Sequence, residues 1–208
     1  MPRNFQRIAS TDSVRRAQEH YYGAAPGPTG AALEFDVLGD EEIAFIQARD
    51  SFYMASVSED GWPYIQHRGG PPGFLRVIDE KTLGFADFKG NRQYITTGNL
   101  ADNPKAYIFV MDYTQRRRVK LWGRARVVED DPALLARLWP EGYKARDEQV
   151  IVFEVEAWDT NCPQHIPQMF HAEDVAHTIQ QFQARVRELE AEVAALKGEQ
   201  AGGPEQAS

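Results

Sequence analysis

Apolar and polar residues alternate along much of the chain from Ser51 onward, a pattern typical of strands that bury one face. The clearest case is "RVKLWGRARVV", residues 118–128, in which the apolar and small residues share one face. The opposite face carries Arg118, Lys120, Trp122, Arg124 and Arg126. We therefore predict a strand that packs against the core on one side and is cationic on the other.

Five further stretches have the period or the apolar content of strands. They span residues 51–58, 62–68, 81–88, 105–113 and 151–158. The first two are separated by residues 59–61, a short turn that ends in a glycine and suits a hairpin. Many strands with few helices indicate a mainly β protein, in which six strands form a closed or nearly closed barrel.

Helix signals flank the predicted barrel. Thr11 or Asp12 is expected to cap a helix that ends at Gly23. Asp40 is expected to cap a second short helix, which has two more acidic residues in its first turn. Asp131, followed by proline, is expected to cap a third. These are peripheral helices around the barrel.

The tail has a different period. Its apolar residues recur alternately every three and four positions, which is the seam of a coiled coil: Val175, Ile179, Phe182, Val186, Leu189, Val193 and Leu196. This long C-terminal helix either packs along its own barrel or pairs with a second copy of the chain. We favour the second arrangement because the seam is narrow and its flanks are charged.

These patterns divide the chain into four parts. Residues 1–32 are expected to hold an N-terminal helix and a linker rich in glycine and proline. Residues 33–167 form the compact strand-rich domain, residues 168–198 form the heptad helix, and residues 199–208 are a flexible tail.

Composition narrows the setting. The net charge of −8 and the isoelectric point near 5.2 argue against a nucleic-acid surface, which needs a cationic face. The single cysteine, Cys162, cannot close an intrachain disulfide, and no stretch approaches the roughly 20 apolar residues that span a bilayer. We expect a cytoplasmic protein that binds neither nucleic acid nor membrane.

Two fragments indicate local chemistry in this acidic chain. In "YIQHRGGPPGF", residues 64–74, Arg68 precedes backbone that a ligand can approach closely, although the same run also suits a bend at a barrel corner. In "FKGNRQYI", residues 88–95, Asn91 is expected to cap a short helix and Arg92 to lie at its positive end, where a phosphate binds well. Together they predict a site for an anionic small molecule.

Four segments, "QHRGGPPGF", "FADFKGNRQYI", "VKLWGRARVV" and "NCPQHIP", resemble in order and separation the pyridoxamine 5'-phosphate oxidase-like FMN-binding proteins of the split β-barrel fold. The resemblance covers about Asp40 to Pro167. It implies a homodimer with FMN at the interface and residues 33–167 as the FMN-binding split barrel. The residues it implies for the cofactor are Gln66, His67, Arg68, Gly69, Gly70, Ala86, Asp87, Asn91, Arg92, Gln93, Arg118 and Lys120.

Within this resemblance, Arg92 and Arg68 would neutralise the phosphate, and Lys120 or Arg118 would stabilise the ring edge that gains negative charge on reduction. His67 and His165 are the candidates for proton transfer, although a lone histidine is more often structural. The arginine with which the true oxidase holds its substrate near its C-terminus has no counterpart here. Cys162, His165 and His171 match no common zinc spacing, so no metal site is predicted.

Two functions remain open from the sequence. One is an FMN-dependent oxidoreductase that exchanges hydride or electrons with a small substrate at flavin N5. The other is a non-catalytic flavin-binding or assembly protein whose C-terminal helix recruits a partner. Neither the substrate nor the electron donor follows from the sequence, and a deazaflavin in place of FMN stays open.

Overall fold

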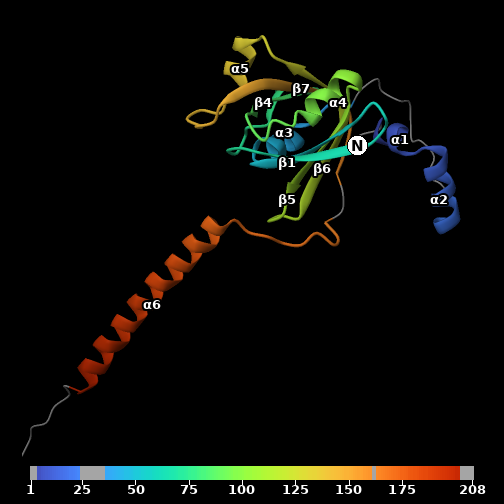
Figure 1. Cartoon of the computed structure of the whole chain (residues 1–208). Helices are drawn as coiled ribbons and strands as arrows, with labels where there is room; N and C mark the ends of the chain where they lie inside the picture. Colours follow the sequence, from blue (N-terminus) through green and yellow to red (C-terminus); the bar gives the residue numbers. More distant parts are fainter. Residues whose placement is uncertain (1–3, 24–35, 161–162, 202–208) are drawn as a thin grey trace, which may run out of the picture. The chain divides into compact units, whose positions relative to one another are not determined.

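The computed structural model describes residues 4–23, 36–160 and 163–201, which form two compact units, Met1–Ile166 and Pro167–Ser208. The first unit is built on one antiparallel sheet in the order β2-β1-β5-β6-β7-β4-β3 (Figure 1). Its strands are β1 (Ser51–Val57), β2 (Pro63–Gly69), β3 (Arg76–Asp79), β4 (Thr82–Phe88), β5 (Lys105–Asp112), β6 (Arg117–Val128) and β7 (Asp147–Thr160).

Among the described residues, five helices accompany the sheet, and a sixth makes up most of the described part of the second unit. They are α1 (Asn4–Ala9), α2 (Asp12–Tyr22), α3 (Asp40–Gln47), α4 (Ile95–Asp102), α5 (Pro132–Leu138) and α6 (Ala172–Ala201). Across the described ranges, no helix combines the length and the apolar character that crossing a bilayer requires.

The prediction of a mainly β fold with peripheral helices and a long C-terminal helix is confirmed, but the sheet has seven strands where six were predicted. The additional strand is β3. It is only four residues long, and its pairing with β4 shifts register between Val77 and Asp79. A run this short and irregular shows no period of two in the sequence.

The helix ends follow capping chemistry in two of the three predicted cases. The Thr11 hydroxyl accepts a hydrogen bond of 3.3 Å from the Val14 amide at the start of α2. The Asp131 carboxylate accepts one of 2.8 Å from the Leu134 amide at the start of α5. The prediction for Asp40 is wrong, because the N-cap of α3 is Gly39 and Asp40 is the first helical residue.

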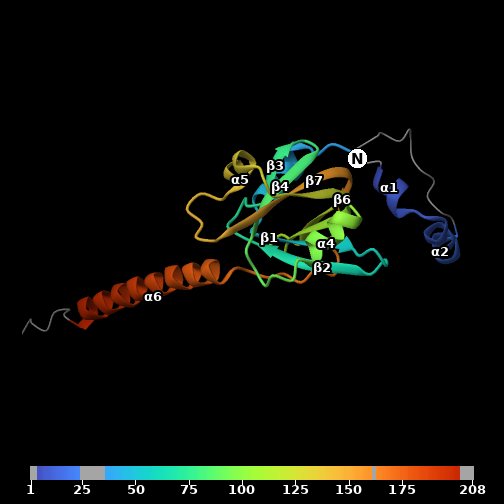
Figure 2. The same ribbon diagram turned by 45° about the horizontal axis from the view of Figure 1, so that its top comes forward.

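An ion pair proves that the sheet curls into a barrel. Arg68 on β2 is paired with Asp87 on β4, and these strands are five positions apart in the sheet. In a flat sheet with strands about 4.8 Å apart, they would be separated by about 24 Å. These two strands, from opposite ends of the sheet order, therefore approach each other. In the rotated view α4 lies beside β1 and β2 (Figure 2).

The barrel interior is filled by the buried faces of its strands. Phe52 on β1 stacks on Phe74, with ring centroids 5.4 Å apart, and meets Phe85 on β4 edge to face at 5.1 Å. Phe74 comes from the run of glycine and proline after β2, so that run supplies a core side chain. Buried aromatic pairs of this kind stabilise a fold beyond the area that they remove from water.

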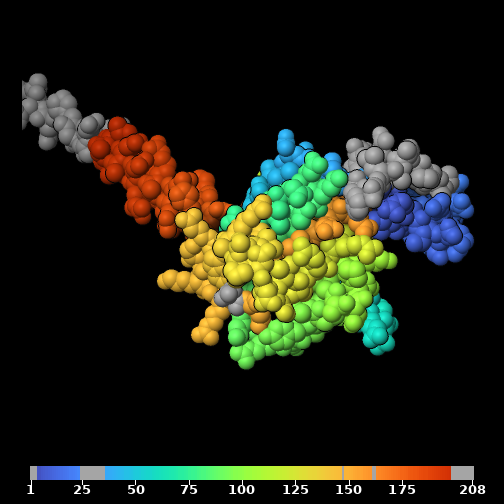
Figure 3. Space-filling view, turned by 90° about the horizontal axis from the view of Figure 1, so that it is seen from above, coloured from blue at the N-terminus to red at the C-terminus, as the bar shows by residue number. Residues whose placement is uncertain are grey.

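A second, smaller core lies on the outer side of the sheet, where α5 packs beside β4 and β7 (Figure 3). Leu138 of α5 is fully buried there, with Val150 and Val152 of β7. Because β7 also buries Ile151 and Phe153 in the barrel, both of its faces are covered. This explains the near-continuous apolar run in its sequence.

Candidate cofactor-binding site

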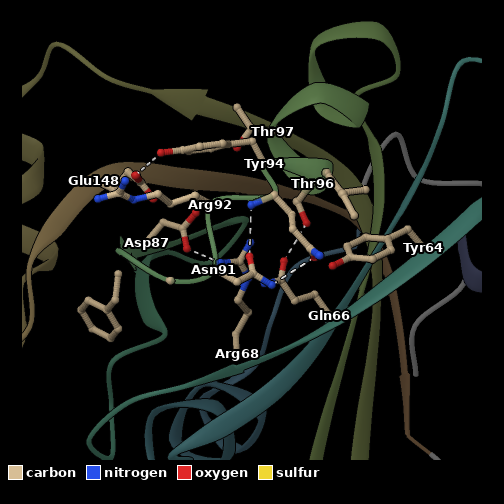
Figure 4. A pocket seen from close by; sticks show the side chains of 14 residues that line it. Tyr64, Gln66, Arg68, Asp87, Asn91, Arg92, Tyr94, Thr96, Thr97 and Glu148 are labelled. Carbon is tan, nitrogen blue, oxygen red and sulfur yellow. Dashed lines mark hydrogen bonds and ion pairs between the residues drawn. The ribbon is translucent and has the colours of Figure 1, made fainter.

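A pocket opens where β2, β4 and the start of α4 meet (Figure 4). Its cavity volume is about 40 Å³, well below the roughly 300 to 1,000 Å³ of ordinary ligand sites, and the pocket is partly open to solvent. The residues that line it are Tyr64, Gln66, Arg68, Asp87, Phe88, Gly90, Asn91, Arg92, Gln93, Tyr94, Ile95, Thr96, Thr97 and Glu148.

The floor of the pocket is a polar network. Arg68 and Asp87 form an ion pair, and their side chains are only 12% and 9% exposed. The Gln149 amide, which is buried, donates to Asp87 Oδ2 at 3.0 Å and to Thr97 Oγ1 at 2.8 Å. Burial raises the pKa of the Asp87 carboxyl, while Arg68 and Gln149 act in the opposite direction. The network therefore joins β2, β4, β7 and α4.

Gln149 provides a test of this network. Replacing it with leucine removes donors from a buried carboxylate and a threonine hydroxyl, so Gln149→Leu is expected to lower the free energy of unfolding by about 1 to 2 kcal/mol. Urea denaturation followed by circular dichroism measures the change. Gln115→Leu, in an exposed turn, is the control. Equal effects of the two substitutions would mean that the Gln149 bonds contribute nothing.

The loop before α4 holds an unusual backbone. Arg92 and Tyr94 have φ angles of 59° and 52°, in the left-handed region that residues other than glycine rarely adopt. The Asn91 side chain accepts a 3.2 Å hydrogen bond from the Gln93 amide and so stabilises the turn. Strain of this kind concentrates at ligand sites, where the surrounding structure holds it in place.

The prediction that Asn91 caps α4 is wrong. The N-cap is Tyr94, and none of the described side chains makes a capping hydrogen bond to this helix. The first amides of a helix have no partner within the helix itself. The amides at the start of α4 are therefore suited to an anionic ligand.

Polar side chains from three elements surround that helix start. The Thr96 hydroxyl donates to Gln66 Oε1 at 3.1 Å, which ties α4 to β2. The Tyr94 hydroxyl donates to the Glu148 carboxylate, and this bond is the main reason why the pKa of Tyr94 is raised. Arg68 is held in an ion pair with Asp87, whereas the described residues provide no ion pair for Arg92. Arg92 is thus a cation available to a ligand.

The structure brings together six of the twelve residues predicted for the cofactor. They are Gln66, Arg68, Asp87, Asn91, Arg92 and Gln93. The other six do not line the pocket: His67, Gly69, Gly70, Ala86, Arg118 and Lys120. The alternation of strands explains part of this division, since Ala86 is buried on the opposite face of β4 from Asp87.

His67 and the neighbouring glycines have other contacts. The His67 ring meets Tyr53 of β1 nearly edge to face, with centroids 5.5 Å apart. The Gly70 amide donates to the Asp50 carbonyl at 2.9 Å, and the Gly73 amide to the Arg49 carbonyl at 3.0 Å. The glycine and proline run therefore fastens the end of β2 to the segment after α3, and these two amides are directed at the protein itself.

Arg118 and Lys120 lie on the outward face of β6. The guanidinium of Arg118 is 6.0 Å from the centroid of Phe109 on β5. The Lys120 ammonium pairs with Asp159 of β7 at 2.5 Å and lies 5.5 Å from the centre of the Trp122 ring. The predicted cationic face of this strand thus exists, but within one chain its charges meet aromatic rings and a carboxylate.

The second candidate for proton transfer, His165, is exposed and has a φ of 64°. It does not line the pocket. Cys162 lies outside the described residues. The prediction that no metal site is present can therefore be compared with the structure only for the other residues. Among the described residues, no group of three histidine, cysteine or acidic side chains is arranged to hold a metal ion.

Sequence reasoning missed several lining residues. Tyr64 shares its face of β2 with Gln66 and Arg68, so the period of two would have identified it. Thr96 and Thr97 open the helix that was predicted after Arg92. Glu148 carried no signal, because it reaches the pocket only through the pairing of β7 with β4.

These residues fit the phosphate end of a flavin mononucleotide. Arg92, the amides at the start of α4 and the Thr97 hydroxyl, which only accepts from Gln149, supply positive charge and donors. Arg68 adds a further donor, since its buried Nε has no hydrogen-bond partner among the described residues. The pocket is small for a complete flavin, so the ring would extend beyond the residues that line it.

A barrel formed from one curled antiparallel sheet, with a pocket of two arginines and two carboxylates at the start of a short helix, defines a protein of the split-barrel class. The family model for pyridoxamine 5'-phosphate oxidase matches residues 38–162, more than half of the chain. The chain belongs to this family of flavin-related oxidoreductases, and the resemblance inferred from the sequence is confirmed.

Several solved structures are similar to this chain at low identity. The chain is 20% identical to HupZ of Group A Streptococcus, with a TM-score of 0.50 over 64% of this chain and 99% of that one. It is also 20% identical to a putative pyridoxamine 5'-phosphate oxidase of Lactobacillus delbrueckii, with a TM-score of 0.48 over 61% and 97%. An FMN-binding protein of Syntrophomonas wolfei is 12% identical, with a TM-score of 0.44 over 59% and 87%. None of the curated proteins compared with the chain matches it.

Proposed function

We propose that this protein binds FMN, with the phosphate at the start of α4, and acts as an FMN-dependent oxidoreductase on a small substrate. The observation that carries the proposal is Arg92, a cation to which the described residues provide no ion pair, beside a helix start that no described side chain caps. Bound FMN would supply hydride or electron exchange at its N5 atom. The residues of the chain would bind and orient it.

Each part of the pocket has a distinct task in this proposal. Arg92 and the first amides of α4 hold the phosphate, and Asn91 and Gln93 keep the loop in its left-handed conformation. Arg68, fixed by Asp87, presents its remaining donors toward the ribityl chain. Gln66 and Thr96 keep β2 against α4.

The ring requires a surface beyond this pocket, and we propose that a second copy of the chain supplies it. The outward face of β6, with Arg118 and Lys120, is the surface proposed to meet the flavin of the other copy. Its cations would lie near the ring edge that becomes negative on reduction. The protein would then be a homodimer with two equivalent sites.

One observation favours the second candidate function, flavin binding without turnover. Neither His67 nor His165 lines the pocket, and the described chain places no other histidine there. Among the described residues, no imidazole is therefore placed for proton transfer beside the phosphate site. The two candidates differ in whether the bound flavin reacts.

An absorbance spectrum of the freshly purified protein tests the binding step. We expect a yellow protein with flavin bands and close to one FMN per chain, identified by the mass of the released chromophore. A deazaflavin would be recognised by its different mass. A colourless protein that takes up no added FMN in a fluorescence titration would refute the proposal. Anaerobic addition of a nicotinamide donor then separates the candidates, since only the oxidoreductase bleaches the flavin.

A further inference from the structure

Helix α6 carries an unbroken seam of apolar side chains. From Val175 to Leu196 the seam repeats over three heptads, and every member is between 43% and 68% exposed. A helix that packs against a globular core usually carries a wider apolar stripe, whereas the seam of α6 occupies only two positions in every seven. A narrow seam sustained over three heptads is typical of a coiled coil.

We propose that α6 pairs with α6 of a second copy of this chain as a parallel, in-register, two-stranded coiled coil. Two observations support this partner: the residue types along the seam and the charges beside it. The proposal does not depend on flavin binding, so either can fail without the other.

The residue types select two strands. With the spacing of the seam, the a positions are Ile179, Val186 and Val193. The d positions are Val175, Phe182, Leu189 and Leu196. All three a residues are β-branched, and two of the four d residues are leucine. β-Branched residues at a with leucine at d favour parallel dimers over trimers and tetramers.

The charges beside the seam select the parallel orientation. In a parallel pair, each g residue faces the e residue of the next heptad on the other helix. Arg185 at g would then face Glu190, and Glu192 at g would face Lys197. Both contacts join opposite charges, and twofold symmetry makes four such contacts in the pair.

An antiparallel pair uses these charges less well. There, g faces g and e faces e. In the register that sets Val186 against Leu189, Arg185 still meets Glu192, but Glu190 meets the uncharged Gln183. Lys197 faces Ala176, so it contributes no ion pair. The parallel arrangement therefore satisfies all four charges, and the antiparallel one leaves two without a charged partner.

Within one helix, Arg185 already pairs with Glu188 at 2.9 Å and reaches Glu192 at 3.8 Å. These contacts are compatible with the proposal, since Arg185 is 58% exposed and changes partner by rotating its side chain. A parallel coiled coil also has the twofold symmetry of ordinary homodimers. It is therefore compatible with the homodimer proposed for the barrel.

Cysteine cross-linking of the full chain tests the pairing. In a Cys162→Ser background, Leu189→Cys at position d and Ala191→Cys at the outer position f are compared under mild oxidation. In a parallel, in-register pair, position 189 meets itself within disulfide reach, whereas position 191 lies on the far side of each helix. We expect at least about tenfold more covalent dimer from Leu189→Cys than from Ala191→Cys.

Equal cross-linking of the two variants would overturn the proposal, because a dimer held only by the barrels brings both positions together at random. Cross-links that form only between Val186→Cys and Leu189→Cys chains in a mixture would overturn the parallel orientation. In the Leu189→Cys chain, Arg185→Glu is expected to reduce cross-linking, and adding Glu190→Arg is expected to restore it. Failure of this rescue would exclude the proposed contact between Arg185 and Glu190.

Discussion

Replacing Gly123 with alanine is expected to destabilise the barrel by about 3 kcal/mol or more, the upper end of the range for overpacked cores. Gly123 lies on β6 where the register with β7 shifts. A Cβ atom there would lie 2.0 Å from the Glu154 carbonyl oxygen and 2.7 Å from the Phe153 ring. One obstacle is backbone and the other is a fully buried side chain, so neither moves aside easily.

The control for this prediction is Gly98→Ala in helix α4. A Cβ at Gly98 would meet nothing within 4 Å, and alanine favours a helix by up to about 1 kcal/mol over glycine. Urea denaturation should therefore show opposite signs for the two substitutions. A Gly123→Ala protein as stable as the wild type would mean that β6 and β7 separate easily at this point.

Gly123 also illustrates what the sequence predicts well and what it leaves out. The alternation along residues 118–128 placed this glycine on the inward face of its strand, and it is buried there. The alternation did not reveal that the backbone of β7 lies against it. That closeness follows from a shift in register between strands some thirty residues apart, which no local pattern records.

The candidate site divides in the same way. Arg92 was found because a turn followed by a helix has local signals, and a basic residue beside a helix start is recognisable in the sequence. Glu148, which lines the pocket, and Gln149, which bonds to Asp87 and Thr97, were missed because the pairing of β4 with β7 brings them there. The capping role predicted for Asn91 was wrong because the left-handed residues Arg92 and Tyr94 delay the helix start.

The site residues that were predicted from the family resemblance show a further limit of reasoning from sequence alone. His67, Gly69 and Gly70 follow Gln66 in sequence, but the period of the strand directs His67 and Gly69 to its other face, and the Gly70 amide bonds to the Asp50 carbonyl. Position in a motif does not by itself determine which way a side chain points. The roles of these residues and of Arg118 and Lys120 in binding a flavin stay predictions.

The Arg92→Ala protein is expected to bind FMN about thirtyfold to a thousandfold more weakly than the wild type, a loss of about 2 to 4 kcal/mol. The reason is that Arg92 would contribute a charge-assisted hydrogen bond to the phosphate at a helix start that no described side chain caps. Riboflavin has no phosphate, so its affinity should be nearly unchanged. Fluorescence titration of the apoprotein with both flavins measures the difference.

Arg116→Ala is a matched control, because Arg116 is also an exposed arginine with a positive φ, 55°, but lies in the turn between β5 and β6 outside the pocket. Both substitutions remove one positive charge and place alanine in the same strained backbone region, so their general effects should cancel in the comparison. If the phosphate is held as proposed, only Arg92→Ala lowers the affinity for FMN while leaving the affinity for riboflavin nearly unchanged. If Arg92→Ala weakens both flavins equally while the protein stays folded by circular dichroism, Arg92 serves the loop, and the phosphate must bind elsewhere.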